Sequence, residues 1–394
     1  MNEYLVKDLL TIRNGKDHKQ LGDGKYPVFG SGGIMRYVDS YLYDKPSILL
    51  PRKGTLDNIQ YCDSPFWCVD TTYYSEVNTS LANPYYLYRY LSLLNLKGLD
   101  SGTALPSMTF DSYYQIKVSL PSIDIQNKIG RALYQIDQKI ALNTRMNAEL
   151  EAMAKQLYDY WFVQFDFPDE NGNPYKSSGG KMVYNSTLKR EIPAGWEACF
   201  VKDLIKDLER GISYSSKDIS LKDGIPMFNL ACYSKQGDYR VGELKIYSGK
   251  VNEVDKVYPL DMLIACTDMT QDADVIGRPV LVTSEFCSYV YSMDLVKITP
   301  KGCDKMYLYY TLRTPFYHKY IKPFASGTNV KHLKVDGVEN YRINLPPQSL
   351  QSKFEKLAMG LKKKQMIIIN ENNYLAHLRD SLLPMLMNGQ VTVE

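Results

Sequence analysis

In two long stretches of the chain, positions that are mostly apolar recur at alternating spacings of three and four residues. In the first stretch these positions are Ile129, Leu133, Ile136, Ile140, Asn143, Asn147, Leu150, Ala154, Leu157 and Trp161. In the second stretch they are Phe354, Ala358, Leu361, Gln365, Ile368, Asn372, Leu375, Arg379, Leu382 and Leu386. This heptad pattern predicts two long helices, each with one face that must be covered. The simplest cover for each face is the other helix.

A strand pattern precedes each predicted helix. Ile116, Val118 and Leu120 alternate with polar residues, and a proline follows them. Tyr341, Ile343 and Leu345 show the same alternation and the same following proline. Alternation of this kind predicts a half-buried strand, and proline is expected to end it.

Both patterns belong to an internal repeat. The segments "SGTALPSMTFDSYYQIKVSLP" (101–121) and "SGTNVKHLKVDGVENYRINLP" (326–346) align without a gap at an offset of 326 − 101 = 225. Gln126 matches Gln351 at the same offset, and "VKDL" occurs both at 6–9 and at 201–204. A repeat of this length indicates that one plan, a globular head followed by a long helix, is used twice.

The repeat predicts an α+β protein with two mixed α/β heads, separated by two long antiparallel coiled-coil helices, with an internal pseudo-twofold. The first helix would span about 60 Å at about 1.5 Å per residue. Asn147 and Asn372 occupy equivalent positions near the middle of the helices, where a buried Asn commonly fixes the register. The predicted segments are a first head at 1–121, a first helix at 122–164, a linker rich in Gly, Pro, Asn and Ser at 165–197, a second head at 198–346 and a second helix at 347–394.

Composition narrows the function only slightly. The formal net charge of +3 excludes a histone-like polycation but not a local basic patch. The seven cysteines form no C-x-x-C pair, which favours reduced thiols in the cytoplasm. There is no run of about 20 apolar residues, so no membrane segment is expected. The four histidines lack metal-ligand spacing, and no P-loop motif occurs.

Two different heads related by a twofold would suit two half-sites on a DNA duplex, although a two-headed protein scaffold would satisfy the same geometry. Candidate DNA contacts are therefore polar loops that follow apolar strands. Arginine and lysine can bind guanine edges or phosphates, and glutamine can pair with adenine. The two SGT turns offer backbone N–H groups and hydroxyls to phosphate, although each is equally suited to closing a head as a simple turn. The candidates are Arg52, Lys53, Thr55, Ser101, Gly102 and Thr103 in the first head, and Thr267, Thr270, Gln271, Arg278, Ser326, Gly327, Thr328 and Lys331 in the second.

The chain resembles the specificity subunit of Type I restriction–modification enzymes. The resemblance rests on "YWFVQFDFPDENGNPYKSSGGKMV", "EIPAGWE", "LRDSLLPMLMNGQV", "YPVFGSGG" and the two "SGT…LP…Q" segments, and it covers nearly the whole chain. The first head lacks the "IPAGWE" lead-in of the second, which we interpret as an abbreviated N-terminus.

The resemblance implies two target-recognition domains, each of which reads one half of a bipartite, asymmetric site in double-stranded DNA. It also implies that the paired helices set the unread spacer and dock the modification subunits, two of them in the expected complex. Such a chain is not itself an enzyme and holds no cofactor. S-adenosylmethionine belongs to the modification subunit, and ATP and Mg belong to the restriction subunits.

Two other functions remain open from the residues alone. "VFGSGG" at 28–33 and Asn83-Pro84-Tyr85-Tyr86 approach the two motifs of a stand-alone adenine methyltransferase. However, serine occupies one motif position, and no alternating strand–helix pattern surrounds them. The structural interpretation is a glycine turn in a β-rich head and a helix start at "NPYYLYRYL". The other function is a two-headed adaptor that does not touch DNA.

Overall fold

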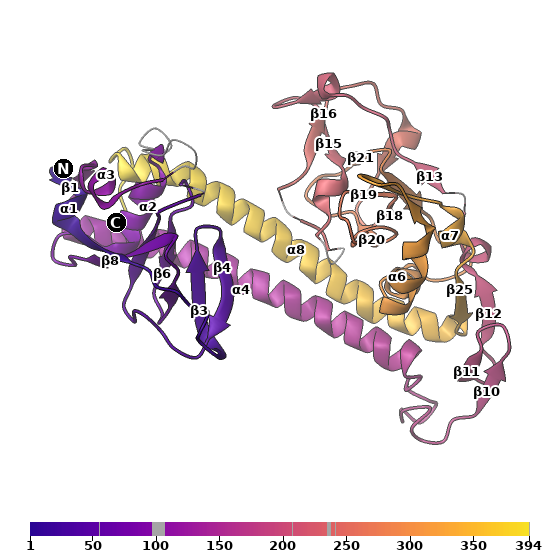
Figure 1. Cartoon of the computed structure of the whole chain (residues 1–394). Coiled ribbons are helices and arrows are strands. Elements are labelled where there is room, and N and C mark those ends of the chain that lie inside the picture. The colour runs from indigo at the N-terminus through magenta and orange to yellow at the C-terminus, as the bar shows by residue number, and fades with distance from the viewer. Residues whose placement is uncertain (55, 97–106, 207, 235–237, 241, 394) are drawn as a thin grey trace. The chain divides into compact units, whose positions relative to one another are not determined.

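The computed structural model describes residues 1–393 apart from 55, 97–106, 207, 235–237 and 241. The chain folds into two compact units. Unit 1 comprises Met1–Ala141 and Tyr374–Glu394, and unit 2 comprises Leu142–Asn373. Each unit therefore contains one head and a part of both long helices, α4 (Ile123–Tyr158) and α8 (Gln348–Met387) (Figure 1).

The head of unit 1 is built on small sheets. Its largest sheet has the strand order β2-β8-β5-β6, a second has the order β4-β3-β7, and β1 pairs with β9. The elements are β1 (Asn2–Leu5), α1 (Val6–Leu9), β2 (Leu10–Asn14), β3 (Asp23–Gly30), β4 (Gly33–Val38), β5 (Ser47–Pro51), β6 (Gln60–Cys62), β7 (Trp67–Cys68), β8 (Thr72–Val77), α2 (Pro84–Ser92), α3 (Phe110–Tyr114) and β9 (Lys117–Leu120).

The head of unit 2 follows the same plan with insertions. Its sheets have the orders β13-β22-β18-β20, β14-β16-β15-β21-β17 and β19-β24-β23, with separate pairs β10-β11 and β12-β25. The strands are β10 (Met182–Asn185), β11 (Arg190–Pro193), β12 (Glu197–Phe200), β13 (Glu209–Arg210), β14 (Ile219–Ser220), β15 (Ile225–Phe228), β16 (Lys245–Tyr247), β17 (Lys256–Val257), β18 (Met262–Ala265), β19 (Thr267–Asp268), β20 (Pro279–Leu281), β21 (Tyr289–Tyr291), β22 (Leu295–Ile298), β23 (Ala325–Ser326), β24 (Lys331–Leu333) and β25 (Arg342–Leu345). The helices of this head are α5 (Lys305–Thr311), α6 (Pro315–Ile321) and α7 (Asp336–Glu339).

The central strands of the two heads have the same arrangement. In unit 1, β5 lies between β8 and β6, and in unit 2, β18 lies between β22 and β20, with every pairing antiparallel. The parallel pair of β3 and β7 likewise corresponds to that of β15 and β21. Tyr26-Pro27-Val28-Phe29 resembles Ile225-Pro226-Met227-Phe228, and Ile48-Leu49-Leu50 resembles Met262-Leu263-Ile264. Both matches fall on these strands, so the repeat is present in the structure as well as in the sequence.

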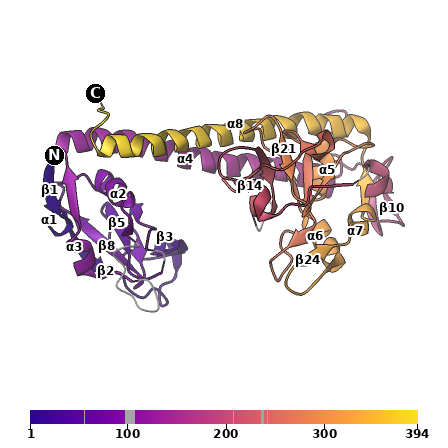
Figure 2. The same cartoon turned by 90° about the horizontal axis from the view of Figure 1, so that it is seen from above.

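The predicted seam is confirmed in both long helices. Every seam position of α4, of the π-helical turn Asp159–Val163 that continues it, and of α8 is buried or half-buried. In unit 1, Leu133 of α4 and Leu383 of α8 belong to one core. In unit 2, Ala154 and Phe354 belong to another. In unit 2, Asn143 of α4 contacts Asn372 of α8, and the later residue Glu151 of α4 contacts the earlier residue Lys362 of α8. The two helices therefore pair antiparallel (Figure 2).

The asparagines of the helix pair meet in a register that differs from the expected one. The side chain of Asn143, one turn before Asn147, donates to Oδ1 of Asn372 at 2.9 Å. The backbone carbonyl of Asn147 instead accepts a hydrogen bond from Gln365 at 2.9 Å. Asn143 and Asn372 therefore form the polar contact that fixes the register.

The segment 165–197 is packed against the second head. Phe165, Ile192 and Trp196 are buried in the core of unit 2. Arg190 lies over the ring of Phe165 and donates to Asn344 of β25 at 2.7 Å. This segment therefore fixes the entry of the chain into the second head through its own hairpin, β10–β11.

Each head joins its long helix through the same two-stranded ribbon. β1 pairs with β9, with Asn2 opposite Leu120, and β12 pairs with β25, with Glu197 opposite Leu345. The first "VKDL" forms α1 and the second forms a 3-10 turn. In both, the aspartate accepts a hydrogen bond from the backbone N–H three residues earlier. The ribbon brings the beginning of each head to the strand that precedes each long helix.

A buried glutamine completes the joint in both units. Gln126 of α4 accepts a hydrogen bond from the backbone N–H of Asn83, which precedes α2, at 3.0 Å, and donates to the carbonyl of Pro121 at 2.9 Å. Gln351 of α8 accepts from the N–H of Asp304, which precedes α5, at 3.0 Å, and donates to the carbonyl of Pro346 at 2.8 Å. Both glutamines are 1% exposed. One buried side chain thus satisfies backbone groups of the head and of the strand–helix turn.

Replacing either glutamine should therefore destabilise its own head. We expect Gln126→Ala to lower the free energy of unfolding by roughly 2–4 kcal/mol, because three hydrogen bonds are lost and buried backbone groups are left unpaired. Amide hydrogen exchange should show the loss of protection in α2 but not in α5, and Gln351→Ala should show the reverse. Gln135→Ala, at an exposed position of α4, is the matched control. Equal effects of Gln126→Ala and Gln135→Ala would contradict the role of the joint.

Candidate nucleic-acid interface

In the first head, the candidate loop follows the central strand β5. Arg52 is half-buried, with its guanidinium 5.9 Å from the ring centre of Tyr73, and one of its nitrogens donates to the carbonyl of Asp70 at 3.3 Å. Lys53 is exposed. Lys53 is therefore the more accessible of the two, while Arg52 is positioned by an aromatic face. Thr55, Ser101, Gly102 and Thr103 lie outside the described residues, and their contacts stay predictions.

The two methyltransferase-like motifs have structural roles in the first head. Asn83 caps α2, because its side chain accepts from the N–H of Tyr86 at 2.9 Å, and both Tyr85 and Tyr86 are buried. The glycine-rich "VFGSGG" forms the tight turn between β3 and β4, where Gly33 adopts a φ of 122°. The predicted helix start and glycine turn are therefore confirmed.

In the second head, the structure gathers several predicted residues beside one small sheet. The strands β19 and β24 pair through Thr267 opposite His332 and Asp268 opposite Lys331. The loop from 269 to 278 follows β19, and the turn with Ser326, Gly327 and Thr328 connects β23 to β24. This sheet, together with its two loops, is the interface candidate of unit 2.

The long loop is organised by a buried carboxylate, Asp268, which is 0% exposed. Its two oxygens accept hydrogen bonds from the backbone N–H groups of Thr270 at 2.7 Å, Val275 at 2.7 Å and Ile276 at 3.1 Å. Ala273, within the loop, has a φ of 52°, in the left-handed region that costs a non-glycine residue roughly 1 kcal/mol. Asp268 therefore holds the loop in a conformation that its own residues would not favour.

The candidate residues of this loop differ in accessibility. Gln271 is exposed, whereas Thr267 is 5% exposed and its hydroxyl donates to Asp294 at 2.9 Å. The Thr270 hydroxyl accepts from the N–H of Asp274 at 2.9 Å. Of these three residues, Gln271 therefore has the most accessible side chain, whereas Thr267 supports the loop from within.

The second SGT turn is an exposed hairpin turn. Ser326, Gly327 and Thr328 are exposed, and Lys331 is half-buried next to them. Gly327 has a φ of 123°, and a Cβ at this position would lie 2.0 Å from the carbonyl oxygen of Val330. Only glycine fits this turn, which explains its presence without reference to DNA. The phosphate contact stays a prediction.

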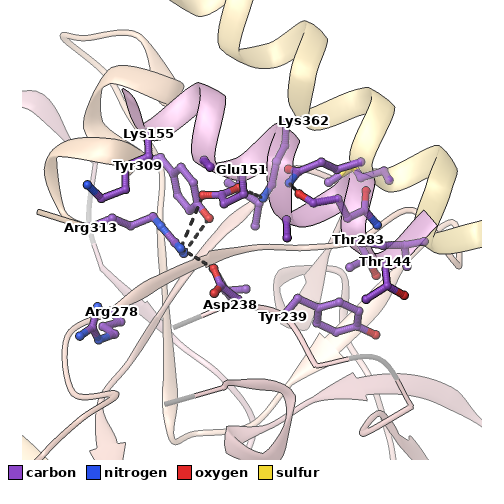
Figure 3. Close-up of a pocket in the computed structure, with 18 of the residues that line it drawn as sticks. Thr144, Glu151, Lys155, Asp238, Tyr239, Arg278, Thr283, Tyr309, Arg313 and Lys362 are labelled. Carbon is purple, nitrogen blue, oxygen red and sulfur yellow. Dashed lines mark hydrogen bonds and ion pairs between the residues drawn. The ribbon is translucent and has the colours of Figure 1, made fainter. Parts of the chain in front are cut away.

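Next to this loop, unit 2 contains a cavity of about 990 Å³, lined by both long helices and the second head (Figure 3). Among its charged lining residues, the cations Lys155, Arg278, Arg313, Lys319, Lys322 and Lys362 outnumber the carboxylates Glu151 and Asp238. Arg278 donates to the carbonyl of Asp274 at 2.6 Å and lies 3.2 Å from Nδ1 of His318. Burial, followed by the positive charge of Arg278, lowers the pKa of His318 to about 4. The predicted residue Arg278 thus belongs to a cationic surface.

Glu151 of α4 is the centre of the charge network in this cavity. Its carboxylate lies 3.3 Å from Nζ of Lys362 on α8 and 3.5 Å from Arg313 of the head, and Arg313 also pairs with Asp238 (Figure 3). Burial alone would raise the pKa of Glu151, but the charges of Lys362 and Arg313 outweigh it, and the pKa is lowered. The network joins both long helices and the head, in one place.

Unit 1 contains a second network of the same kind. Asp137 of α4 pairs with Arg379 of α8 at 2.7 Å and with Arg89 of α2 in the head. All three side chains are mostly buried, at 21%, 21% and 12% exposed. In both units, one carboxylate on α4 therefore lies between a cation of α8 and a cation of the head.

Sequence reasoning missed these networks and the role of Asp268. The network of unit 1 involves Arg379, the basic residue among the seam positions, and this exception could have indicated a carboxylate partner. Asp268 left no comparable mark, since an aspartate in a polar loop is ordinarily a surface residue. Its burial depends on how the loop folds back on β19.

Comparisons with known proteins agree with this architecture. The model of the Type I restriction modification DNA specificity domain matches residues 1–152. The specificity subunit of the Type I restriction enzyme MjaIX from Methanocaldococcus jannaschii is 28% identical over 321 residues, 79% of this chain and 69% of the relative. That of HindI from Haemophilus influenzae is 24% identical over 341 residues, 74% of this chain and 72% of the relative.

A solved structure shows the same fold along the chain. The crystal structure of the Type-I restriction-modification system S subunit from M. genitalium matches with a TM-score of 0.64 at 14% identity, over 98% of this chain and 95% of that one. The fold is thus that of a two-headed α+β protein in which each head is anchored on the same pair of helices. In sequence, the chain is similar to specificity subunits of Type I restriction–modification enzymes. In the described part of the chain, no helix is both long enough and apolar enough to span a membrane.

The buried carboxylate of Asp268 gives a test of the interface loop. We expect Asp268→Asn to destabilise unit 2 by roughly 1–3 kcal/mol. In the native chain the carboxylate accepts hydrogen bonds from backbone N–H groups, and in the variant an amide N–H₂ would replace one of the accepting oxygens. Hydrogen exchange at Thr270, Val275 and Ile276 should accelerate. Asp272→Ala, at an exposed position of the same loop, should change neither measurement. Unchanged exchange in Asp268→Asn would show that the loop is held in another way.

Proposed function

We propose that this chain is the DNA sequence-specificity subunit of a Type I restriction–modification complex, and that each head reads one half of a bipartite site. The observation that carries the proposal is the duplicated joint. The same ribbon and the same buried glutamine fix two heads of one architecture to the helix pair, while the loop after β5 and the loop after β19 differ in sequence. Two heads with different loops would read two different half-sites, which makes the target asymmetric.

The proposal assigns different tasks to the heads and to the helices. In the heads, exposed Gln271 would contact a base edge, while Lys53, Lys331 and Arg278 would contact phosphate or guanine. The paired helices would set the unread spacer and dock the modification subunits, for which we propose two copies. The names of the curated relatives, which are specificity subunits of Type I restriction enzymes, support a role of this chain in sequence specificity.

The chemistry of the complex would belong to other chains. We propose that S-adenosylmethionine is bound by the modification subunit, that ATP and Mg are used by the restriction subunits, and that the complex acts in the cytoplasm on double-stranded DNA. The structural roles of "VFGSGG" and Asn83 in the first head favour this division over a stand-alone methyltransferase.

Exchange of one head tests the proposal. Residues 6–116 should be replaced by the corresponding head of a relative, so that β1, β9, α4 and the whole of unit 2 stay native. We expect the methylated site to change in one half only, with the same spacer, because the second head and the helix pair are untouched. Sequencing that detects methylated adenines measures this directly. A site that changes in both halves, or in neither, would contradict the assignment of one half-site to each head.

Two substitutions separate base contacts from phosphate contacts in the second head. With the modification subunits attached, Gln271→Ala should weaken binding to the specific site by about 1–3 kcal/mol and relax one position of it. Lys331→Ala should weaken binding to all sequences and reduce the slope of log affinity against log salt by about 1. Lys301→Ala, an exposed lysine between β22 and α5, is the control. Indistinguishable profiles for the two variants would contradict the division of roles.

A further inference from the structure

Each of the two charge networks contains one ion pair between the long helices α4 and α8. In unit 1, Asp137 of α4 contacts Arg379 of α8. In unit 2, Glu151 of α4 contacts Lys362 of α8. At these contacts α4 thus contributes both carboxylates and α8 contributes both cations. All four side chains are between 16% and 21% exposed, so solvent screens their charges only in part.

The internal repeat shows what would happen if like helices paired. At the offset of 225, which also relates Gln126 to Gln351, the equivalent of Asp137 is Lys362. In a pair of two α4 helices with the native register, Asp137 would occupy the position of Lys362 and would face Glu151. In a pair of two α8 helices, Lys362 would occupy the position of Asp137 and would face Arg379. A pair of two α4 helices would therefore contain two contacts between carboxylates, and a pair of two α8 helices would contain two contacts between cations.

The polar contact at the middle of the helix pair adds to this preference. Asn143 contacts Asn372 in the native pair. The repeat equivalent of Asn143 is Ile368, so in a pair of two α8 helices the amide of Asn372 would face an isoleucine. A buried amide without a partner is unfavourable, which makes this arrangement a second penalty against pairing of α8 with itself.

We propose that α4 and α8 form an electrostatic code that admits only the pairing of α4 with α8 and rejects pairing of either helix with its copy in a second chain. The proposal goes beyond reading DNA, because it concerns how the chain avoids partners made of itself. A pair of like helices would carry two identical heads. The code therefore keeps the two different heads together on one helix pair.

The decisive variant reverses one ion pair and leaves the other native. In Glu151→Lys/Lys362→Glu, both contacts between α4 and α8 remain attractive, and Arg313, which lies beside both residues, gains a carboxylate at 362. However, a pair of two α4 helices would now place Lys at 151 opposite Asp137, and a pair of two α8 helices would place Glu at 362 opposite Arg379. The rejection of like pairing is thereby removed, and intrachain pairing is retained.

The measurement uses full-length chains with two different tags, which are mixed, unfolded in denaturant and refolded together. We expect the wild type to refold as monomers, with few mixed-tag species recovered by sequential affinity purification. The half-reversed variant should yield about tenfold more mixed-tag dimers, with the mass confirmed by light scattering. A tenfold change corresponds to about 1.4 kcal/mol of relieved repulsion.

The control reverses both ion pairs, through Asp137→Lys, Glu151→Lys, Lys362→Glu and Arg379→Glu. This chain has more substitutions than the half-reversed variant, yet like pairing is again repulsive, so we expect it to return to the wild-type level of mixed dimers. Glu151→Gln/Lys362→Gln removes the repulsion without adding a charge, so its yield of mixed-tag dimers should lie between those of the wild type and the half-reversed variant. This neutral variant tests the proposal if the reversed variants do not fold. The proposal is overturned if the wild type, the half-reversed chain and the neutral variant form mixed dimers equally, or if the doubly reversed chain dimerises as much as the half-reversed one.

Discussion

The buried glutamine at the start of each long helix is the contact on which the rest of the structure depends. Gln126 and Gln351 each satisfy the backbone N–H at the start of a head helix and the carbonyl of the proline that begins the turn into the long helix. Because unpaired backbone groups are costly in a buried environment, this contact permits little variation in how a head meets its helix. A head can therefore change its loops without changing its attachment.

The repeat itself reflects this division between attachment and recognition. The strand, the proline and the glutamine keep a constant offset, whereas matches farther upstream occur at shifting offsets. The second head carries additional strands and a long loop held by Asp268, and the first head has a shorter loop around Arg52. Insertions thus occur within the heads, while the joint and the charged contacts of the helix pair preserve the scaffold.

Much of this architecture could be predicted from the sequence, because it rests on periodic patterns. The heptad positions identified both helices, and the gapless repeat identified the strand before each one. The pairing of Asn372 with Asn143 could not be predicted, since it depends on where the axis of the helix pair falls relative to the repeat. Nor could the inward position of Thr267 or the burial of Asp268, because both follow from how one loop folds against β19. Periodicity identifies the elements, but the site depends on contacts between distant residues.

The central claim is that two different heads on one chain direct modification to a split DNA site. It is tested most directly by mapping methylated adenines across the genome of cells that contain the modification subunit, with and without this chain. The account predicts that one motif becomes methylated only when the chain is present, and that this motif consists of two different half-sites separated by unread bases. Methylation that does not depend on the chain, or a continuous motif without a spacer, would contradict it.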